Sequence, residues 1–156
     1  MNIFNKSVFF LVLSVQFFYL NGDVLIHAGN LIDVETGKIE SRKSIVIKNS
    51  LITSVSDGYI NESDFQEYYD LKDSYVLPGL MDAHVHLAQE YVPKAERDLK
   101  VEPEFNAIFA AANAIKTLNA GFTTVRNVGD GGMETISLRN AINKGIVPGP
   151  RILTSG

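Results

Sequence analysis

The sequence has no cysteine among its 156 residues. This absence excludes disulfide bonds, thiolate metal sites, a cysteine nucleophile and a lipidated cysteine near the N-terminus. The sequence also lacks an excess of positive charge, because 14 Lys and Arg stand against 18 Asp and Glu and leave a formal net charge of −4. A nucleic-acid-binding surface needs clustered Lys and Arg, so nucleic acid is not an expected partner. Hydrophobic residues make up 46% of the chain and charged residues 21%, which is the usage of a globular protein.

Residues 1–22 differ in composition from the rest of the chain. They contain one charged side chain, Lys6, followed by an apolar run over residues 8–20. The run is shorter than the roughly 20 residues of a membrane span and is typical of a secretory signal peptide. We predict that residues 1–22 direct secretion or transport to the periplasm, with cleavage after Gly22. Leu20 stands where a small residue is usual, so an uncleaved membrane tether is the alternative.

Residues 23–75 have the pattern of a small β-sheet. Two runs rich in β-branched residues flank Asn49 and Ser50, a spacing that predicts a hairpin, although glycine in place of Ser50 would be the stronger signal. Asp33 and Gly37 predict a turn, and the polar residues 57–64 predict a loop. The expected strands are 24–26, 44–48, 51–55 and 68–76.

After residue 76 the pattern becomes β-α-β-α-β. Apolar residues at helical spacing predict one helix, ended by Gly121, and a second that is capped by Asp130 and ended by Gly145. A polar loop is expected over 89–104. The expected strands are 80–87, 122–128 and 151–154. This order is typical of an α/β fold with a parallel sheet and crossover helices. Three strands and two helices neither cover both faces of such a sheet nor close a barrel, so we expect part of a larger fold.

Two of the three histidines, His84 and His86, lie two residues apart in the first of these strands. Side chains at this spacing point to the same face of a strand, where two imidazoles can share a divalent metal. Asp82 has the same parity and would either orient one imidazole or act as a ligand itself. Apolar neighbours in the segment 80–87 predict burial on both faces, which favours a metal over the alternative of two solvated histidines.

Four segments carry a resemblance to a known family. Residues 76–87 resemble the opening barrel strand of the metal-dependent amidohydrolase superfamily. Residues 120–126, and the stretch from Leu138 to Ile152, resemble the branch that includes imidazolonepropionase and Xaa-Pro dipeptidase. Residues 25–33 are similar to the first strands of the same family, so the resemblance extends in order from residue 23 to residue 156.

The resemblance implies an incomplete TIM-type (β/α)8 barrel over residues 76–156, preceded by part of a small β-sandwich over residues 23–75. It implies one or two divalent ions, zinc being the first expectation, with His84 and His86 as the first two ligands. The metal would activate water to attack a C–N bond in a non-peptide amide, a lactam or an Xaa-Pro-type substrate. The remaining ligands and the catalytic base are expected beyond Gly156.

Four other features have weaker implications. Asn127 stands where the family commonly has Asp, which argues against an acid role there. Arg126 either lines the site or pairs with a carboxylate elsewhere in the fold. His27 is expected to be structural or at the surface. The glycine cluster at 129–132 lacks the lysine and the spacing of a phosphate-binding loop.

The leading hypothesis is that the chain is part of an exported amidohydrolase that acts on a small-molecule or peptide-like substrate. These 156 residues alone would be inactive. The alternative is a non-catalytic relic, or a small exported binding module that keeps the first elements of the fold. An open third strand predicts that the chain alone aggregates or stays partly unfolded unless a partner covers it. No feature of the sequence predicts an oligomeric state.

Overall fold

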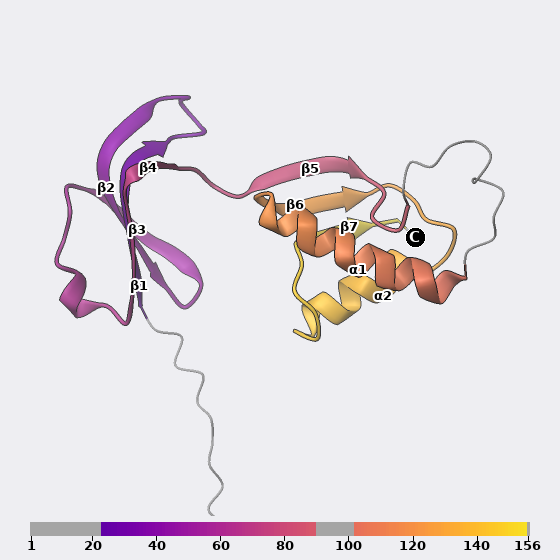
Figure 1. Cartoon of the computed structure of the whole chain (residues 1–156). Helices are drawn as coiled ribbons and strands as arrows, with labels where there is room; N and C mark the ends of the chain where they lie inside the picture. Colours follow the sequence, from indigo (N-terminus) through magenta and orange to yellow (C-terminus); the bar gives the residue numbers. More distant parts are fainter. Residues whose placement is uncertain (1–22, 90–101, 156) are drawn as a thin grey trace, which may run out of the picture. The chain divides into compact units, whose positions relative to one another are not determined.

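The structure is a computed structural model, and it describes residues 23–89 and 102–155. The chain forms two compact units that divide between Leu77 and Pro78 (Figure 1). The predicted signal segment 1–22 and most of the predicted loop at 89–104 lie outside the described residues. Within the described residues, no helix is long and apolar enough to cross a membrane.

The described part of the first unit is a four-stranded sheet with the order β3-β2-β1-β4. The pairs β1–β2 and β2–β3 are antiparallel, whereas β4 runs parallel to β1. The strands are longer than predicted because polar residues such as Ser41 and Lys43 pair across the sheet as fully as the apolar runs do. A short 3-10 helix, Glu62–Asp64, lies within the predicted polar loop. The strands are β1 Val24–Ile32, β2 Ile39–Lys48, β3 Leu51–Asp57 and β4 Glu67–Val76.

The predicted hairpin is confirmed between β2 and β3. Its two turn residues, Asn49 and Ser50, have φ angles of 50° and 63°. Positive φ at both central residues is the type I′ geometry that matches the twist of the flanking strands. Asparagine tolerates this region, but serine has a Cβ that crowds the backbone there, so Ser50 is a strained position.

His27 belongs to the core of this sheet, with 1% of its surface exposed. Its Nδ1 lies 3.0 Å from the Tyr68 hydroxyl, and its ring lies 4.7 Å from the Tyr59 ring, centre to centre. Of the two roles predicted for His27, structural or at the surface, the structural one is therefore correct.

Gly29 is required by an irregularity in the pairing of β1 with β4. Ala28 pairs with Leu71 and Asn30 with Tyr75, so three residues of β4 lie opposite Gly29 alone. The β4 backbone comes so close that a Cβ on Gly29 would lie 2.0 Å from the carbonyl oxygen of Lys72. Only glycine lets the two strands approach at this point.

The second unit confirms the predicted β-α-β-α-β order. Its three strands are all parallel, in the order β5-β6-β7. Gly121, with a φ of 96°, ends the first helix as predicted, and that helix begins at Pro103, inside the predicted loop. The elements are β5 Leu80–Val85, α1 Pro103–Asn119, β6 Phe122–Asn127, α2 Glu134–Asn143 and β7 Arg151–Thr154.

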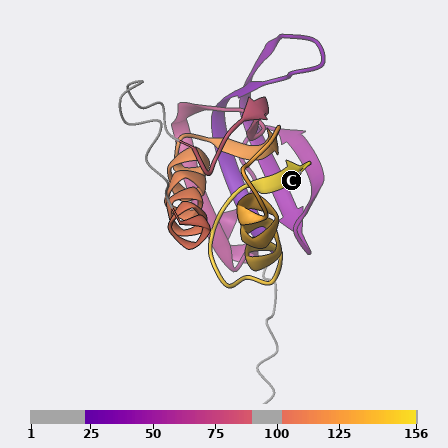
Figure 2. The same cartoon turned by 90° about the vertical axis from the view of Figure 1, so that its right-hand side faces the viewer.

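Both helices pack on the same face of this sheet. They lie side by side in Figures 1 and 2, with α1 against β6 and α2 against β7. The core between the helices and the sheet includes Val125 of β6, Ile152 of β7 and Leu138 of α2. The opposite face of the sheet is not covered by any described element of this unit. The prediction that residues 80–87 are buried on both faces is therefore wrong, and Leu80 and Met81 are 41% and 77% exposed.

The apolar residues that predicted α1 are not the residues that pack. Ala110 and Ala114 are fully buried against the sheet, whereas Phe105 and Ile108 are exposed. Small side chains let the helix axis approach β6 closely, so the larger apolar residues are left on the outer side of the helix.

Replacement of Ser50 by glycine is expected to stabilise the small sheet. Ser50→Gly should raise the free energy of unfolding by about 0.5–1 kcal/mol, because relief of the left-handed strain outweighs the added chain entropy of glycine. The matched control is Ser54→Gly on the exposed side of β3, where glycine should lower stability by about 0.5–1 kcal/mol. Urea unfolding measures the free energy of unfolding of both variants, and amide hydrogen exchange reports the local stability of β2 and β3. A loss of stability in Ser50→Gly would contradict the strain.

Candidate metal centre

The carboxyl ends of the three parallel strands meet at one edge of the sheet. Val85, at the end of β5, pairs with Asn127 at the end of β6, which pairs in turn with Thr154 at the end of β7. Because the ends are in register, the residues at or just after them lie close together. This edge is where β/α barrels place their active sites.

A bulge shapes β5 just before it reaches this edge. Asp82 pairs with Val125 and Val85 with Asn127, so β5 has one more residue than β6 over the same stretch. The Asp82 carboxylate accepts a hydrogen bond from the backbone N–H of His84 at 2.9 Å. This bond holds the extra residue in place.

Arg126 holds the same bulge from the neighbouring strand. Its Nε donates to the carbonyl oxygen of Ala83 at 2.8 Å. Arg126 forms no salt bridge with any residue in the described ranges, so the predicted carboxylate partner is not found there. Asp82 likewise forms no hydrogen bond with either histidine ring in that part of the chain, and its contact is with the backbone of His84 instead.

The prediction that the strand runs to Leu87 is wrong by two residues. β5 ends at Val85, and His86 belongs to the turn that follows. Strand alternation alone therefore does not bring the two imidazoles together. The bulge places His84, and the turn places His86.

His84 and His86 nevertheless face each other. Their ring centres are 5.4 Å apart and the ring planes are inclined by 69°. Two imidazoles that bind one zinc ion tetrahedrally through bonds of about 2.0–2.1 Å have ring centres roughly 5 Å apart. Both side chains are exposed to solvent, which leaves room for a metal and further ligands. The pair thus fits two positions of a metal coordination shell.

A backbone carbonyl fixes the tautomer of His86. The Nδ1 atom lies 3.0 Å from the carbonyl oxygen of Gly129. A carbonyl oxygen only accepts hydrogen bonds, so Nδ1 carries the proton and the lone pair resides on Nε2. Neutral imidazole with Nδ1–H bonded to a carbonyl is the form that binds metals through Nε2.

The turn that carries His86 is held from β6 and α1. The Leu87 N–H donates to Asn127 Oδ1 at 2.8 Å, and the Leu87 carbonyl accepts from Asn113 Nδ2 at 3.0 Å. The Val128 N–H donates to the Val85 carbonyl at 3.1 Å. No local pattern in the sequence indicates these roles, because each one depends on a partner about 26 to 43 residues away.

The prediction that Asp130 caps α2 is wrong in position, because Met133 occupies the N-cap and has no side-chain cap bond. Asp130 still contacts the helix start from the loop after β6. Its Oδ2 accepts from the backbone N–H of Thr135, in the first turn of α2, at 3.1 Å. The helix begins at Glu134, later than expected, so Asp130 reaches it from the preceding loop.

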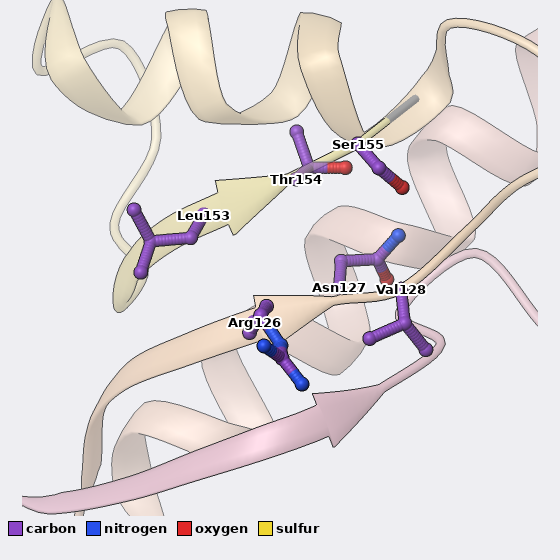
Figure 3. A pocket seen from close by; sticks show the side chains of 6 residues that line it. All are labelled: Arg126, Asn127, Val128, Leu153, Thr154 and Ser155. Atoms are coloured by element: carbon purple, nitrogen blue, oxygen red, sulfur yellow. The ribbon is translucent and has the colours of Figure 1, made fainter.

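An open pocket of about 450 Å³ lies at the ends of β6 and β7 (Figure 3). Arg126 lines it, whereas His84 and His86 do not. No group of three His, Cys, Asp or Glu side chains suited to a metal occurs within residues 23–89 and 102–155. Within these ranges, two imidazoles lie close together and no third side chain of these types joins them. The pocket is lined by Arg126, Asn127, Val128, Leu153, Thr154 and Ser155.

Comparison with known proteins places this arrangement in a family. The model of the amidohydrolase family matches residues 75–156, just over half of the chain and including both histidines. The chain belongs to the amidohydrolase family. Members of this superfamily typically use divalent metals, in agreement with the paired imidazoles.

Two solved structures and a curated protein illustrate the relationship. A Xaa-Pro dipeptidase with methionine bound in its active site is 52% identical, with a TM-score of 0.83 over 86% of this chain and 33% of that one. A prolidase complexed with N-methylphosphonate-L-proline is 28% identical, with a TM-score of 0.72 over 86% of this chain and 32% of that one. Adenine deaminase from Thermosipho africanus is 38% identical over 74 residues, 47% of this chain and 12% of that protein. The chain therefore spans about a third of the length of these solved amidohydrolases.

The tautomer of His86 gives a test that needs no metal. In metal-free, 15N-labelled protein above pH 8, long-range 1H–15N spectra should show His86 protonated at Nδ1 and bare at Nε2. His84 has no hydrogen bond to its ring within the described residues and should show a mixture of both tautomers. A His86 ring protonated mainly at Nε2 would contradict the contact with Gly129.

Proposed function

We propose that this amidohydrolase chain is part of an exported, metal-dependent hydrolase that cleaves the C–N bond of Xaa-Pro-type dipeptides. The observation that carries the proposal is the convergence of His84 and His86 at the carboxyl edge of the sheet, with Nε2 of His86 free to bind. In this proposal β5 to β7, with α1 and α2, are the opening part of a (β/α)8 barrel whose later strands supply the other ligands.

The chain's own residues would prepare the site in three ways. His84 and His86 hold one or two divalent ions, with zinc as the first expectation, and Gly129 keeps the His86 lone pair on Nε2. A metal bound there supplies water of lowered pKa at neutral pH. Asp82 and Arg126 keep the bulge in the conformation that brings His84 toward His86.

Arg126 also suggests how a dipeptide could be oriented. It lines the open pocket beside the bulge and is exposed to solvent. A dipeptide carries a free carboxylate, and a guanidinium binds a carboxylate through strong charge-assisted hydrogen bonds. We assign Arg126 as a lining residue that favours an anionic substrate group.

Similarity supports the Xaa-Pro substrate over a purine. The likeness to the Xaa-Pro dipeptidase is 52% identity over 86% of the chain, whereas the likeness to adenine deaminase is 38% over 47%. A site shared with a dipeptidase would have to admit the proline amide, which has no N–H to donate.

The test uses the longest protein encoded by the reading frame that contains this chain. Loaded with zinc, it should hydrolyse Met-Pro faster than Met-Ala and should leave adenine and dihydroorotate unchanged. His84→Ala and His86→Ala should each lose bound metal and lower kcat/KM by more than about 100-fold, beyond the usual effect of residues that only support a ligand. The control is Met81→Ala, at a largely exposed position of the same strand. It should keep the bound metal and the wild-type kcat/KM.

Other outcomes of this assay have distinct meanings. A folded protein that binds no zinc and turns over none of these substrates would favour a non-catalytic relic or binding module. If the protein converts adenine but not the dipeptides, the proposed metal chemistry would stand and the proposed Xaa-Pro substrate would be wrong.

Export is a separate part of the proposal. The first described strand begins at Val24, so cleavage after Gly22 would leave the whole described fold in the mature protein. N-terminal sequencing of the protein recovered outside the cytoplasm should read Asp-Val-Leu-Ile, beginning at Asp23. Recovery of the uncleaved chain in the membrane fraction would support the tether, and recovery from the cytoplasm would overturn export.

A further inference from the structure

We propose that Asn127 is a positioning residue that sets the metal ligand His86 through the backbone of Leu87, and that it requires Asp130 to do so. This inference rests on the proposed metal function. It begins from the environment of Asn127, whose side chain is completely buried and forms three hydrogen bonds.

The partners of Asn127 dictate the chemistry of its side chain. Oδ1 accepts from the Leu87 N–H at 2.8 Å, while Nδ2 donates to Asp130 Oδ1 at 3.0 Å and to Thr135 Oγ1 at 3.1 Å. A backbone N–H can only donate and a carboxylate only accepts, so one end of the side chain must be an acceptor and the other a donor. An amide meets both demands at once.

A carboxylate at position 127 would supply the acceptor for the Leu87 N–H but not the donor for Asp130. It could still accept from Leu87, but its other oxygen would face Asp130 at hydrogen-bond distance without a proton between them. Two carboxylates in such contact in a buried site cannot both be ionised without a large free-energy penalty. The Asp that the sequence resemblance leads one to expect at this position is therefore disfavoured by Asp130.

The orientation of Asn127 reaches His86 through one peptide unit. His86 lies between Val85, whose carbonyl accepts from Val128, and Leu87, whose N–H is held by Asn127. The His86 ring is itself bonded to Gly129. If Asn127 releases the Leu87 N–H, one of these three restraints is lost and the peptide that carries the ligand can rotate.

A charge exchange tests this arrangement. Asn127→Asp should weaken zinc binding by about 10- to 100-fold, the range of changes to residues that orient a metal ligand. The double variant, Asn127→Asp with Asp130→Asn, restores a donor facing an acceptor. Its amide at position 130 can donate to the carboxylate at position 127 and still accept from the Thr135 N–H. The zinc affinity of the double variant should return to within about threefold of the wild type, on that same scale.

The measurements are zinc affinity by competition with a chelator, the absorption spectrum of the cobalt-substituted protein, and the melting temperature of the metal-free protein. They use the longest protein encoded by the reading frame. Asn140→Asp makes the same chemical change at an exposed position of α2 and should alter none of them. The cobalt spectrum should change in Asn127→Asp and recover in the double variant, which a purely structural role of Asn127 would not produce.

Each result decides the inference. Unchanged zinc affinity in a destabilised Asn127→Asp protein would overturn it, as would a folded double variant whose affinity stays low. If Asn127→Asp does not fold, the folded double variant alone decides, since it must bind zinc with near-normal affinity. Wild-type protein that binds no zinc would instead refute the proposed function, and this inference with it.

Discussion

The parallel pairing of β5 with β6 is the interaction on which the candidate site depends. It places Val85 beside Asn127, and from there the end of β6 and the loop after it hold the turn after β5 at three points. Two of those points involve backbone carbonyls, so they restrain the turn whatever side chains occupy the loop. The geometry of the two histidines is thus a property of strand pairing more than of the histidines themselves.

Much of the fold could be predicted from the sequence because it depends on local patterns. The β2–β3 hairpin, the alternation of strands with helices, and the glycine that ends α1 were all visible as short-range signals. The bulge in β5 and the end of that strand at Val85 were not, since Arg126 and Asn127 bond to this stretch from another strand. The spacing of His84 and His86 predicted their approach correctly, although the structure brings it about by a different route.

The burial of side chains in the second unit shows another property that sequence patterns did not predict. Apolar composition over residues 80–87 predicted burial on both sides, and apolar spacing in α1 marked a helix whose large residues point outward. Composition reports that a side chain can be buried, but not which neighbour buries it. In the described unit, alanines make the contact with the sheet while Phe105 and Ile108 remain exposed.

The bonds that shape the His86 turn join residues 40 and 43 positions apart in the chain. A contact between residues this far apart in the chain costs more loop-closure entropy than a contact between neighbours. His84 and His86 are neighbours in the sequence, but the bonds that orient His86 exist only when β6 is paired with β5. An ion that arrived earlier would meet two freely rotating imidazoles, so tight capture would report that assembly is complete.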